Sequence, residues 1–131
     1  MLKVVVIDGN AISRNLLTSV LVNGGFDVIG DSNASAASLA AMIKLQPQLV
    51  CIDLGGADEA AFEKLATIRE GLPKAVVFLV SGQFDTATVQ SAVDRGVHGF
   101  IVKPFNAVNV LGSIRKAIIK LARAHRSPTE A

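Results

Sequence analysis

Five short runs of mostly apolar, often β-branched residues alternate with stretches of helical periodicity, and this alternation limits the fold more than any other feature of the sequence. The runs cover residues 3–7, 26–29, 49–52, 75–80 and 99–102. Four of them are apolar nearly throughout, which is typical of parallel strands covered on both faces of a sheet. The second run is the exception and indicates an edge strand.

The stretches between these runs carry apolar residues at the spacing of one helix face. The first helix is predicted to begin after Asn10, a good N-cap residue, and to end at Gly24-Gly25. Its apolar face consists of Ile12, Leu16, Leu17, Val20 and Leu21, and that of the fifth helix of Val108, Leu111, Ile114, Ile118, Leu121 and Ala122. Strand–helix order repeated five times, with right-handed crossovers, predicts an α/β fold with a doubly wound, five-stranded parallel sheet, (βα)5.

The length and composition fit one compact domain. Of the 131 residues, 50% are hydrophobic and 18% charged, which is enough apolar material for a single core. The longest apolar runs are about six residues, too short to cross a bilayer, and Asp8 ends the N-terminal run too early for a secretory signal. The single cysteine, Cys51, favours a reducing compartment. We therefore expect a cytoplasmic protein without a membrane segment, with a domain over residues 1–125 and a tail, the start of a linker, over 126–131.

The charge is small in total and uneven along the chain. Thirteen Lys and Arg against eleven Asp and Glu leave a net charge of +2, too small for general affinity for nucleic acids. No acid lies between Asp94 and Glu130, so the predicted fifth helix is basic. No recognised nucleic-acid motif accompanies it, and we expect no direct nucleic-acid binding. Ile119 falls off the main apolar face of this helix, which favours a protein interface.

Four polar residues of complementary chemistry stand at the ends of four predicted strands: Asp8, Asp53, Ser81 and Lys103. The carboxyl ends of parallel strands form one rim, where ligands bind, so we expect these side chains to converge. A carboxylate can attack phosphorus and form an acyl phosphate, and Mg²⁺ is commonly held by one or two carboxylates with phosphate oxygens and water. A Lys and a hydroxyl can bind the phosphoryl oxygens. The pattern predicts phosphoryl transfer to a carboxylate.

These residues resemble the receiver domain of two-component response regulators over essentially the whole chain. The family has an acidic pair after strand one, an Asp after strand three, a Ser or Thr after strand four, and a Lys-Pro-aromatic triplet after strand five. The matching positions here are Asp8, Asp53, Ser81 and Lys103-Pro104-Phe105. The spacing of 22 residues from Ser81 to Lys103, and an aromatic residue three positions before that lysine, are also typical. The resemblance implies a flavodoxin-like, CheY-like sheet with strand order 2-1-3-4-5.

The resemblance also implies a signalling module that catalyses only its own phosphorylation and dephosphorylation, and not an enzyme with other substrates. Asp53 would accept a phosphoryl group from a sensor histidine kinase or a phosphotransfer protein. Mg²⁺ would be held by Asp8, Asp53 and the backbone carbonyl of Gly55, and Lys103 would bind the phosphoryl oxygens. Ser81 and Phe100 would then switch the face formed by the fourth helix, fifth strand and fifth helix. That face would bind a downstream protein, serve a fused output domain, or form a homodimer.

The chain departs from the family at Gly9, where the second acid of the pair is missing. Two carboxylates still suit Mg²⁺, so we expect binding to be weakened and not abolished. Asp58 and Glu59, in the loop after Asp53, are candidates to lend an acid. Two hypotheses follow: a phosphorylated receiver, and a phosphorylation-independent pseudo-receiver that acts as a protein-interaction module.

Two other classes share part of the pattern and are excluded by particular residues. Haloacid-dehalogenase-like phosphohydrolases need a second acid where this chain has Asn10, and an acidic pair after the lysine, where residues 104–129 contain none. Flavodoxin-like cofactor binders need a phosphate-cradling loop after the first strand and aromatic residues around the flavin. Asp8 occupies that loop here, and Trp and Tyr are absent.

Overall fold

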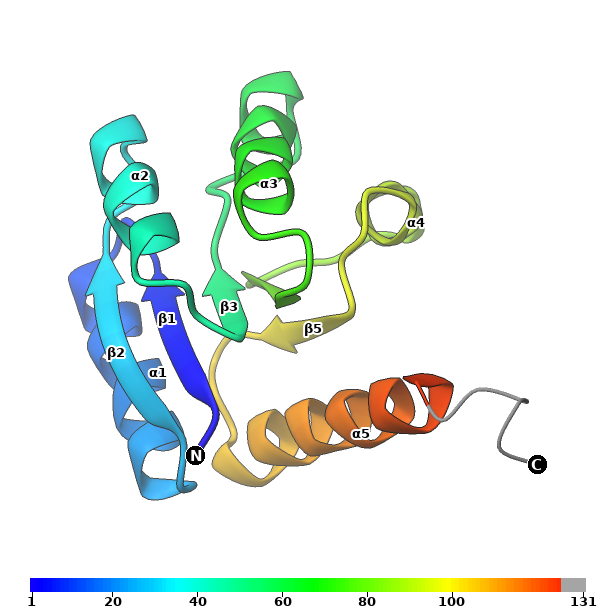
Figure 1. The fold of residues 1–131 in the computed structure, drawn as a ribbon. Coiled ribbons are helices and arrows are strands. Elements are labelled where there is room, and N and C mark those ends of the chain that lie inside the picture. The colour runs from blue at the N-terminus through cyan, green and yellow to red at the C-terminus, as the bar shows by residue number, and fades with distance from the viewer. Residues whose placement is uncertain (126–131) are drawn as a thin grey trace.

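All ten predicted elements are present, in the predicted order (Figure 1). The computed structural model describes residues 1–125, and the tail expected at 126–131 lies outside the described residues. The strands are β1 (Lys3–Ile7), β2 (Asp27–Ser32), β3 (Leu49–Ile52), β4 (Val76–Ser81) and β5 (Gly99–Val102). The helices are α1 (Ala11–Asn23), α2 (Ala36–Lys44), α3 (Glu59–Gly71), α4 (Thr86–Asp94) and α5 (Ala107–His125).

The five strands form one parallel sheet in the order β2-β1-β3-β4-β5, which confirms the doubly wound prediction. Helices α1 and α5 cover one face, and α2, α3 and α4 cover the other (Figure 1). β1 and β3 are buried from Val4 to Ile7 and from Leu49 to Ile52, because each contributes side chains to the cores on both faces. None of the helices in the described part of the chain is long and apolar enough to span a membrane.

The prediction of an edge position for the second strand is confirmed, but its predicted length is wrong. β2 runs to Ser32, past the predicted end of the apolar run at residue 29. Its pairing with β1 continues from Val6 opposite Asp31 to Ile7 opposite Ser32, and the amide of Asp8 donates to the Ser32 carbonyl at 2.9 Å. The side chains of this edge strand are all at least partly exposed, so the polar residues Asp31 and Ser32 can continue it.

The predicted apolar faces of α1 and α5 are wrong at their ends. Ile12 and Leu16 are 73% and 56% exposed, and Val108 is 80% exposed, whereas Leu17, Leu21 and Ile114 are buried; Ala122 is exposed as well. A helix of 19 residues is about 28 Å long, and a strand of four residues about 13 Å. The ends of α5 therefore have no strand beneath them, whereas on α1 Leu16 directly precedes the buried Leu17 and so faces away from the sheet.

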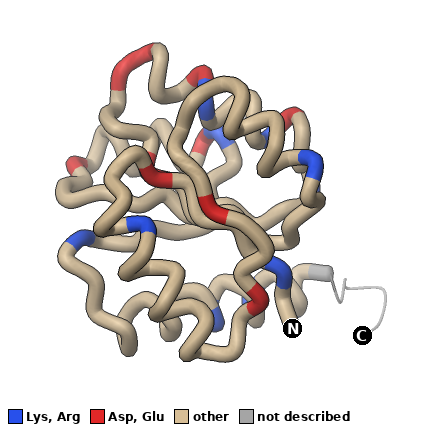
Figure 2. The backbone as a smooth tube through the Cα atoms, turned by 90° about the vertical axis from the view of Figure 1, so that its left-hand side faces the viewer, with Lys and Arg blue, Asp and Glu red and all other residues tan. Residues whose placement is uncertain are grey.

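Acidic residues lie mainly on one side of the sheet. In Figure 2 most acidic positions, drawn red, lie in the upper part of the view, toward α2, α3 and α4. Neither α1 nor α5 contains an Asp or Glu. The face of the sheet covered by α1 and α5 is therefore the more basic one.

Cys51 and Phe78 show how tightly the centre of the sheet is packed. Cys51 is completely buried, and burial raises the pKa of its thiol to about 12, so it stays protonated and unreactive. A Cβ atom at Gly99 on β5 would overlap the buried ring of Phe78. This position accepts only glycine without displacing a core aromatic residue.

We therefore expect Gly99→Ala to destabilise the domain by about 1–3 kcal/mol, the usual cost of overpacking a core. The matched control is Gly112→Ala on α5, where a Cβ would have no heavy atom within 4 Å. It should stabilise the domain by up to about 1 kcal/mol, because alanine favours helix more than glycine does. Urea unfolding followed by far-ultraviolet circular dichroism measures both, and equal effects of the two substitutions would contradict this account of Gly99.

The side chain of His98 extends the hydrogen bonding between β4 and β5 at the start of β5. The amide of Val77 donates to Nδ1 of His98 at 3.0 Å, and the amide of His98 donates to the Val77 carbonyl at 2.8 Å. Partial burial of the ring, and then the positive charge of Arg69, lower the pKa of His98 below its ordinary 6.5. The bond from Val77 requires Nδ1 without a proton, which the lowered pKa favours.

Because the pKa of His98 is lower in the folded than in the unfolded chain, its contribution to stability is present at neutral pH. It is lost as the pH falls below 6.5 toward the lower pKa of the folded state. The lost hydrogen bond corresponds to about 1 kcal/mol. His98→Asn keeps an acceptor near the position of Nδ1 and removes the titration. Urea unfolding of both proteins between about pH 7 and 5 should show a steeper loss of stability for the wild type, and parallel curves would exclude this role.

Candidate functional site

Backbone pairing places all four predicted polar residues at one rim. The amide of Asp8 bonds to the edge strand β2, as described above, and the amide of Asp53 donates to the Ile7 carbonyl at 2.8 Å. The amide of Lys103 donates to the carbonyl of Ser81 at 2.9 Å. Each residue following a strand is thus still held by a neighbouring strand. The rim has little freedom in its backbone, and the side chains start from fixed positions.

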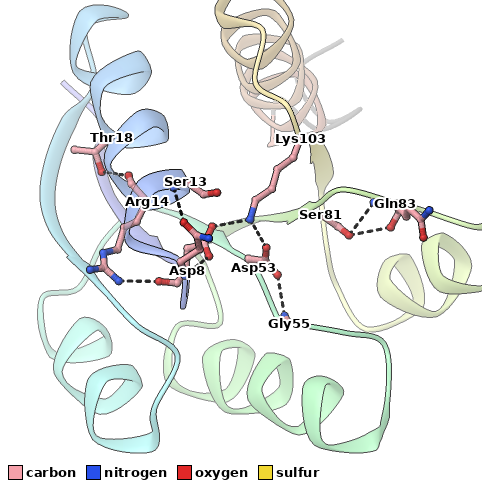
Figure 3. Close-up of polar contacts among 10 residues, drawn as sticks. Asp8, Ser13, Arg14, Thr18, Asp53, Gly55, Ser81, Gln83 and Lys103 are labelled. Carbon is pink, nitrogen blue, oxygen red and sulfur yellow. Dashed lines mark hydrogen bonds and ion pairs between the residues drawn. The ribbon is translucent and has the colours of Figure 1, made fainter.

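The Lys103 ammonium lies between the two carboxylates (Figure 3). Its Nζ atom is 2.7 Å from Oδ2 of Asp53 and 3.0 Å from Oδ2 of Asp8. The side chain of Asp8 is 6% exposed, that of Asp53 18% and that of Lys103 23%. The predicted convergence of these three residues is confirmed. They form a small charged cluster with limited access to water.

The other carboxylate oxygens bond to backbone amides. Oδ1 of Asp8 accepts from the amide of Asn10 at 2.9 Å, and Oδ1 of Asp53 accepts from the amide of Gly55 at 2.8 Å. Gly55 adopts a φ of 78°, in the left-handed region that favours glycine. The glycine therefore lets the loop after β3 turn back so that its amide reaches the Asp53 carboxylate.

The two carboxylates keep Lys103 charged. Burial by itself would lower the pKa of the Lys103 ammonium, but the hydrogen bonds and negative charges of Asp53 and Asp8 outweigh it and raise the pKa above the ordinary 10.5. The lysine therefore remains a cation at neutral pH, and its ion pairs stabilise the fold until the solution becomes strongly alkaline.

The Ser81 side chain does not join this cluster. Its hydroxyl donates to the carbonyl of Gln83 at 2.9 Å and accepts from the Gln83 amide at 3.2 Å (Figure 3). Ser81 thus lies at the predicted rim, in one cavity with Asp53, but its hydroxyl stays outside the charged cluster because a local turn of the β4–α4 loop satisfies it. A cavity of about 640 Å³ separates the loop after β3 from this loop and is lined by Asp53, Ser81 and Phe84, among others.

Phe100 lies half-buried on β5 and packs against a second aromatic residue that the sequence analysis did not single out. The rings of Phe84 and Phe100 meet edge to face, with centroids 5.0 Å apart and an interplanar angle of 73°. Phe84 immediately follows Gln83, the partner of Ser81. A short chain of contacts therefore joins the Ser81 hydroxyl to the ring of Phe100.

Arg14 is a further residue of the rim that the sequence analysis missed. Its Nη1 atom donates to the backbone carbonyl of Asp8 at 2.8 Å, and its Nε atom lies 3.4 Å from Oδ1 of Asp31. These contacts tie α1 to the ends of β1 and β2. A basic residue in the first turn of the helix after the first strand is a weak signal, because the contact depends on where that helix crosses the rim.

The donor set fits Mg²⁺ at its lower limit. Two carboxylates, those of Asp8 and Asp53, meet at the rim, which is within what a magnesium site requires. No cluster of three or more metal-ligating His, Cys, Asp or Glu side chains occurs within residues 1–125. Asp58 does not supply a third carboxylate, because it caps α3 by accepting from the amide of Ala61 at 2.9 Å.

Gly9 is the open position beside this pair. A Cβ atom there would have no heavy atom within 4 Å, and the backbone of Gly9 lies outside the left-handed region. No steric or conformational reason in the described chain therefore demands glycine at position 9. The position would accept a carboxylate-bearing side chain.

Sequence comparison relates the chain to one family. The profile of the response regulator receiver domain matches residues 4–115. The chemotaxis protein CheY of Listeria monocytogenes is 27% identical over 117 residues, which cover 89% of this chain and 98% of that protein. The DNA-binding transcriptional regulator NtrC of Rhizobium meliloti is 32% identical over 128 residues, 97% of this chain and 25% of that protein.

Solved structures show the same fold. A response regulator from Thermotoga maritima superimposes with a TM-score of 0.79 at 25% identity, covering 90% of this chain and 98% of the other. NtrX from Brucella abortus, solved in complex with ADP, gives a TM-score of 0.78 at 25% identity, covering 98% of this chain and 28% of the other. The similarity thus extends both to stand-alone proteins of this size and to one domain of much longer ones.

Proposed function

Because this chain belongs to the response regulator receiver domain family, we propose that Asp53 accepts a phosphoryl group from a sensor histidine kinase or a phosphotransfer protein. The observation that carries the proposal is the position of Lys103, whose Nζ atom bonds both Asp53 and Asp8. A carboxylate held next to a cation, at the rim formed by the strand ends, suits a nucleophile for phosphorus.

In the proposed reaction an oxygen of Asp53 attacks the phosphorus of a phosphohistidine. The new oxygen–phosphorus bond forms an acyl phosphate, and the phosphorus–nitrogen bond breaks with its electron pair moving to the imidazole. Lys103 would pass from the carboxylate to a phosphoryl oxygen and neutralise charge there. The amide of Gly55 would keep the Asp53 carboxyl group in place through its bond to Oδ1.

The residues that would hold Mg²⁺ are Asp8 and Asp53, with the backbone carbonyl of Gly55 as the third protein ligand. A bound divalent cation would neutralise charge on the phosphoryl oxygens during transfer. With Gly9 in place of an acid, the protein contributes less negative charge to this site. We therefore propose that the affinity for Mg²⁺ is weak.

The Ser81 hydroxyl would report the phosphoryl group to the face formed by α4, β5 and α5. Its bonds to Gln83 are local and weak, so a phosphoryl oxygen can compete for the hydroxyl. The β4–α4 loop would then move, and with it Phe84, whose ring packs on Phe100. A preference of a few kcal/mol for one of two existing states is enough to change the affinity for a partner.

Two apolar side chains beside the rim support docking of a phosphodonor protein. Ile12 and Leu16 are exposed on the first turns of α1, which follows Asp8 directly. Exposed apolar residues next to a reactive rim favour a protein partner there. Downstream of phosphorylation, we propose that the chain acts on a separate protein or on a fused output domain.

Gly9 supports one alternative, a pseudo-receiver that binds its partner without phosphorylation. The test is the intact mass of the protein after incubation with acetyl phosphate and Mg²⁺, beside a receiver that is known to be phosphorylated. We expect an adduct of one phosphoryl group that EDTA suppresses. A folded protein with no adduct, next to a phosphorylated control, would instead support the pseudo-receiver.

A further inference from the structure

A groove runs between the edge strand β5 and helix α5, on the opposite side of β5 from α4. Its volume is about 800 Å³, and its lining includes Phe78, Phe100, Lys116, Ile119, Lys120 and Arg123. We call it the β5–α5 groove. Because β5 is the last strand of the sheet, no further strand closes it.

The α5 wall of the groove combines one exposed apolar residue with three cations. Lys116, Ile119, Lys120 and Arg123 follow one another at helical spacing and so form a single stripe. Ile119 is 52% exposed, and the three basic residues are exposed as well. Across from this stripe the sheet lines the groove with His98, Gly99 and Phe100, and Phe78 lies buried beneath them. A ligand would therefore meet apolar surface inside the groove and positive charge along its margin.

The positive charges are not neutralised within the described chain. None of the three cations forms an ion pair with another residue of 1–125. Neither β5 nor α5 contains an Asp or Glu. A surface that carries charge of only one sign beside an apolar groove is complementary to a partner with the opposite charge.

We propose that the β5–α5 groove binds an acidic segment of a partner protein, one that also places an apolar side chain against Ile119 and Phe100. A second copy of this chain fits less well, because a symmetric pair would set Lys116, Lys120 and Arg123 against the same residues of the copy. A nucleic acid also fits less well. Phe78 is 1% exposed and Phe100 is half-buried, so at most one ring could stack on a base.

Phe100 connects this groove to the rim, since it lines the groove and packs on Phe84. Phosphorylation of Asp53 would therefore change the shape of the groove floor and the affinity for the acidic segment. This response rests on the proposed function, whereas the charge preference of the groove does not.

The test uses short synthetic peptides added to the isotope-labelled chain, with amide chemical shifts as the readout. A peptide of glutamate and leucine residues should shift amides of β5 and α5, and higher salt should weaken it. A glutamine–leucine peptide and a glutamate–serine peptide should each bind at least about tenfold more weakly, a difference of about 1.4 kcal/mol. Equal binding of any of these, or tighter binding of a single-stranded oligonucleotide, would overturn the proposal.

Two double variants of equal charge change locate the site. Lys116→Glu with Lys120→Glu should weaken the glutamate–leucine peptide at least about tenfold. Lys44→Glu with Lys74→Glu changes exposed lysines away from the groove and should leave its affinity within about twofold. Equal losses in both variants would show that only net charge matters. Self-association of the wild type that the first variant abolishes would assign the groove to a second copy.

The same titration after treatment with acetyl phosphate separates this inference from the proposed function. Groove binding without an adduct would leave the inference standing and remove phosphorylation. An adduct without groove binding would do the reverse.

Discussion

Asp53→Asn is expected to lose the phosphoryl adduct completely. The substitution keeps the size of the side chain and an oxygen that can accept from the Gly55 amide, but it removes the charge that attacks phosphorus. The pocket should stay folded, because Lys103 retains its ion pair with Asp8 at 3.0 Å. Intact mass after acetyl phosphate and Mg²⁺ measures the loss directly.

Asp58→Asn is the matched control for this experiment. Asp58 lies in the same loop, and its side chain caps α3 by accepting from the Ala61 amide. Asparagine caps a helix about as well as aspartate, so this variant should be phosphorylated like the wild type. An adduct that persists in Asp53→Asn would point to the other carboxylate bonded to Lys103, that of Asp8, and would contradict the assignment of Asp53.

The sheet could be predicted from the sequence because its signal lies in local patterns. Continuous apolar runs such as 3–7 and 49–52 form strands with those bounds. The strand ends then place Asp8, Asp53 and Lys103 at one rim as a consequence of parallel order. The residues that converge there are determined by topology, and topology follows from the alternation of strands and helices.

The errors concern properties that depend on neighbours in space. Ile12 and Leu16 match the apolar period of α1 but lie beside its buried stripe of Leu17 and Leu21, and periodicity alone does not report which apolar residues of a helix the sheet covers. Ser81 follows its strand as predicted, yet its hydroxyl bonds within its own loop. The contact between Arg14 and the Asp8 carbonyl depends on how α1 crosses the rim. In each case a pairwise contact decides the outcome, and no spacing in the sequence encodes it.

Gly9 leaves room for a further acid beside the charged cluster. Two carboxylates and one ammonium leave the cluster of Asp8, Asp53 and Lys103 with a single net negative charge. Gly9→Asp would add a further one, at a position where a Cβ has no heavy atom within 4 Å. Two unit charges 4 Å apart interact by about 4 kcal/mol at an effective dielectric constant of about 20. Even a fraction of this attraction toward a divalent cation is large.

We therefore expect Gly9→Asp to bind Mg²⁺ at least about tenfold more tightly than the wild type, a gain of about 1.4 kcal/mol. Without Mg²⁺ the added charge repels Asp8 and Asp53, so the variant should be less stable than the wild type and should gain more stability when Mg²⁺ is added. Titration calorimetry measures the affinity, and thermal unfolding with and without Mg²⁺ measures how much stability the metal adds.

Gly9→Asn has the same size without the charge, so it should behave like the wild type in both measurements. If the asparagine variant gained as much affinity as the aspartate variant, the added charge would not be the cause. If neither gained, position 9 would not face the metal site, and the weak affinity would have another cause than Gly9.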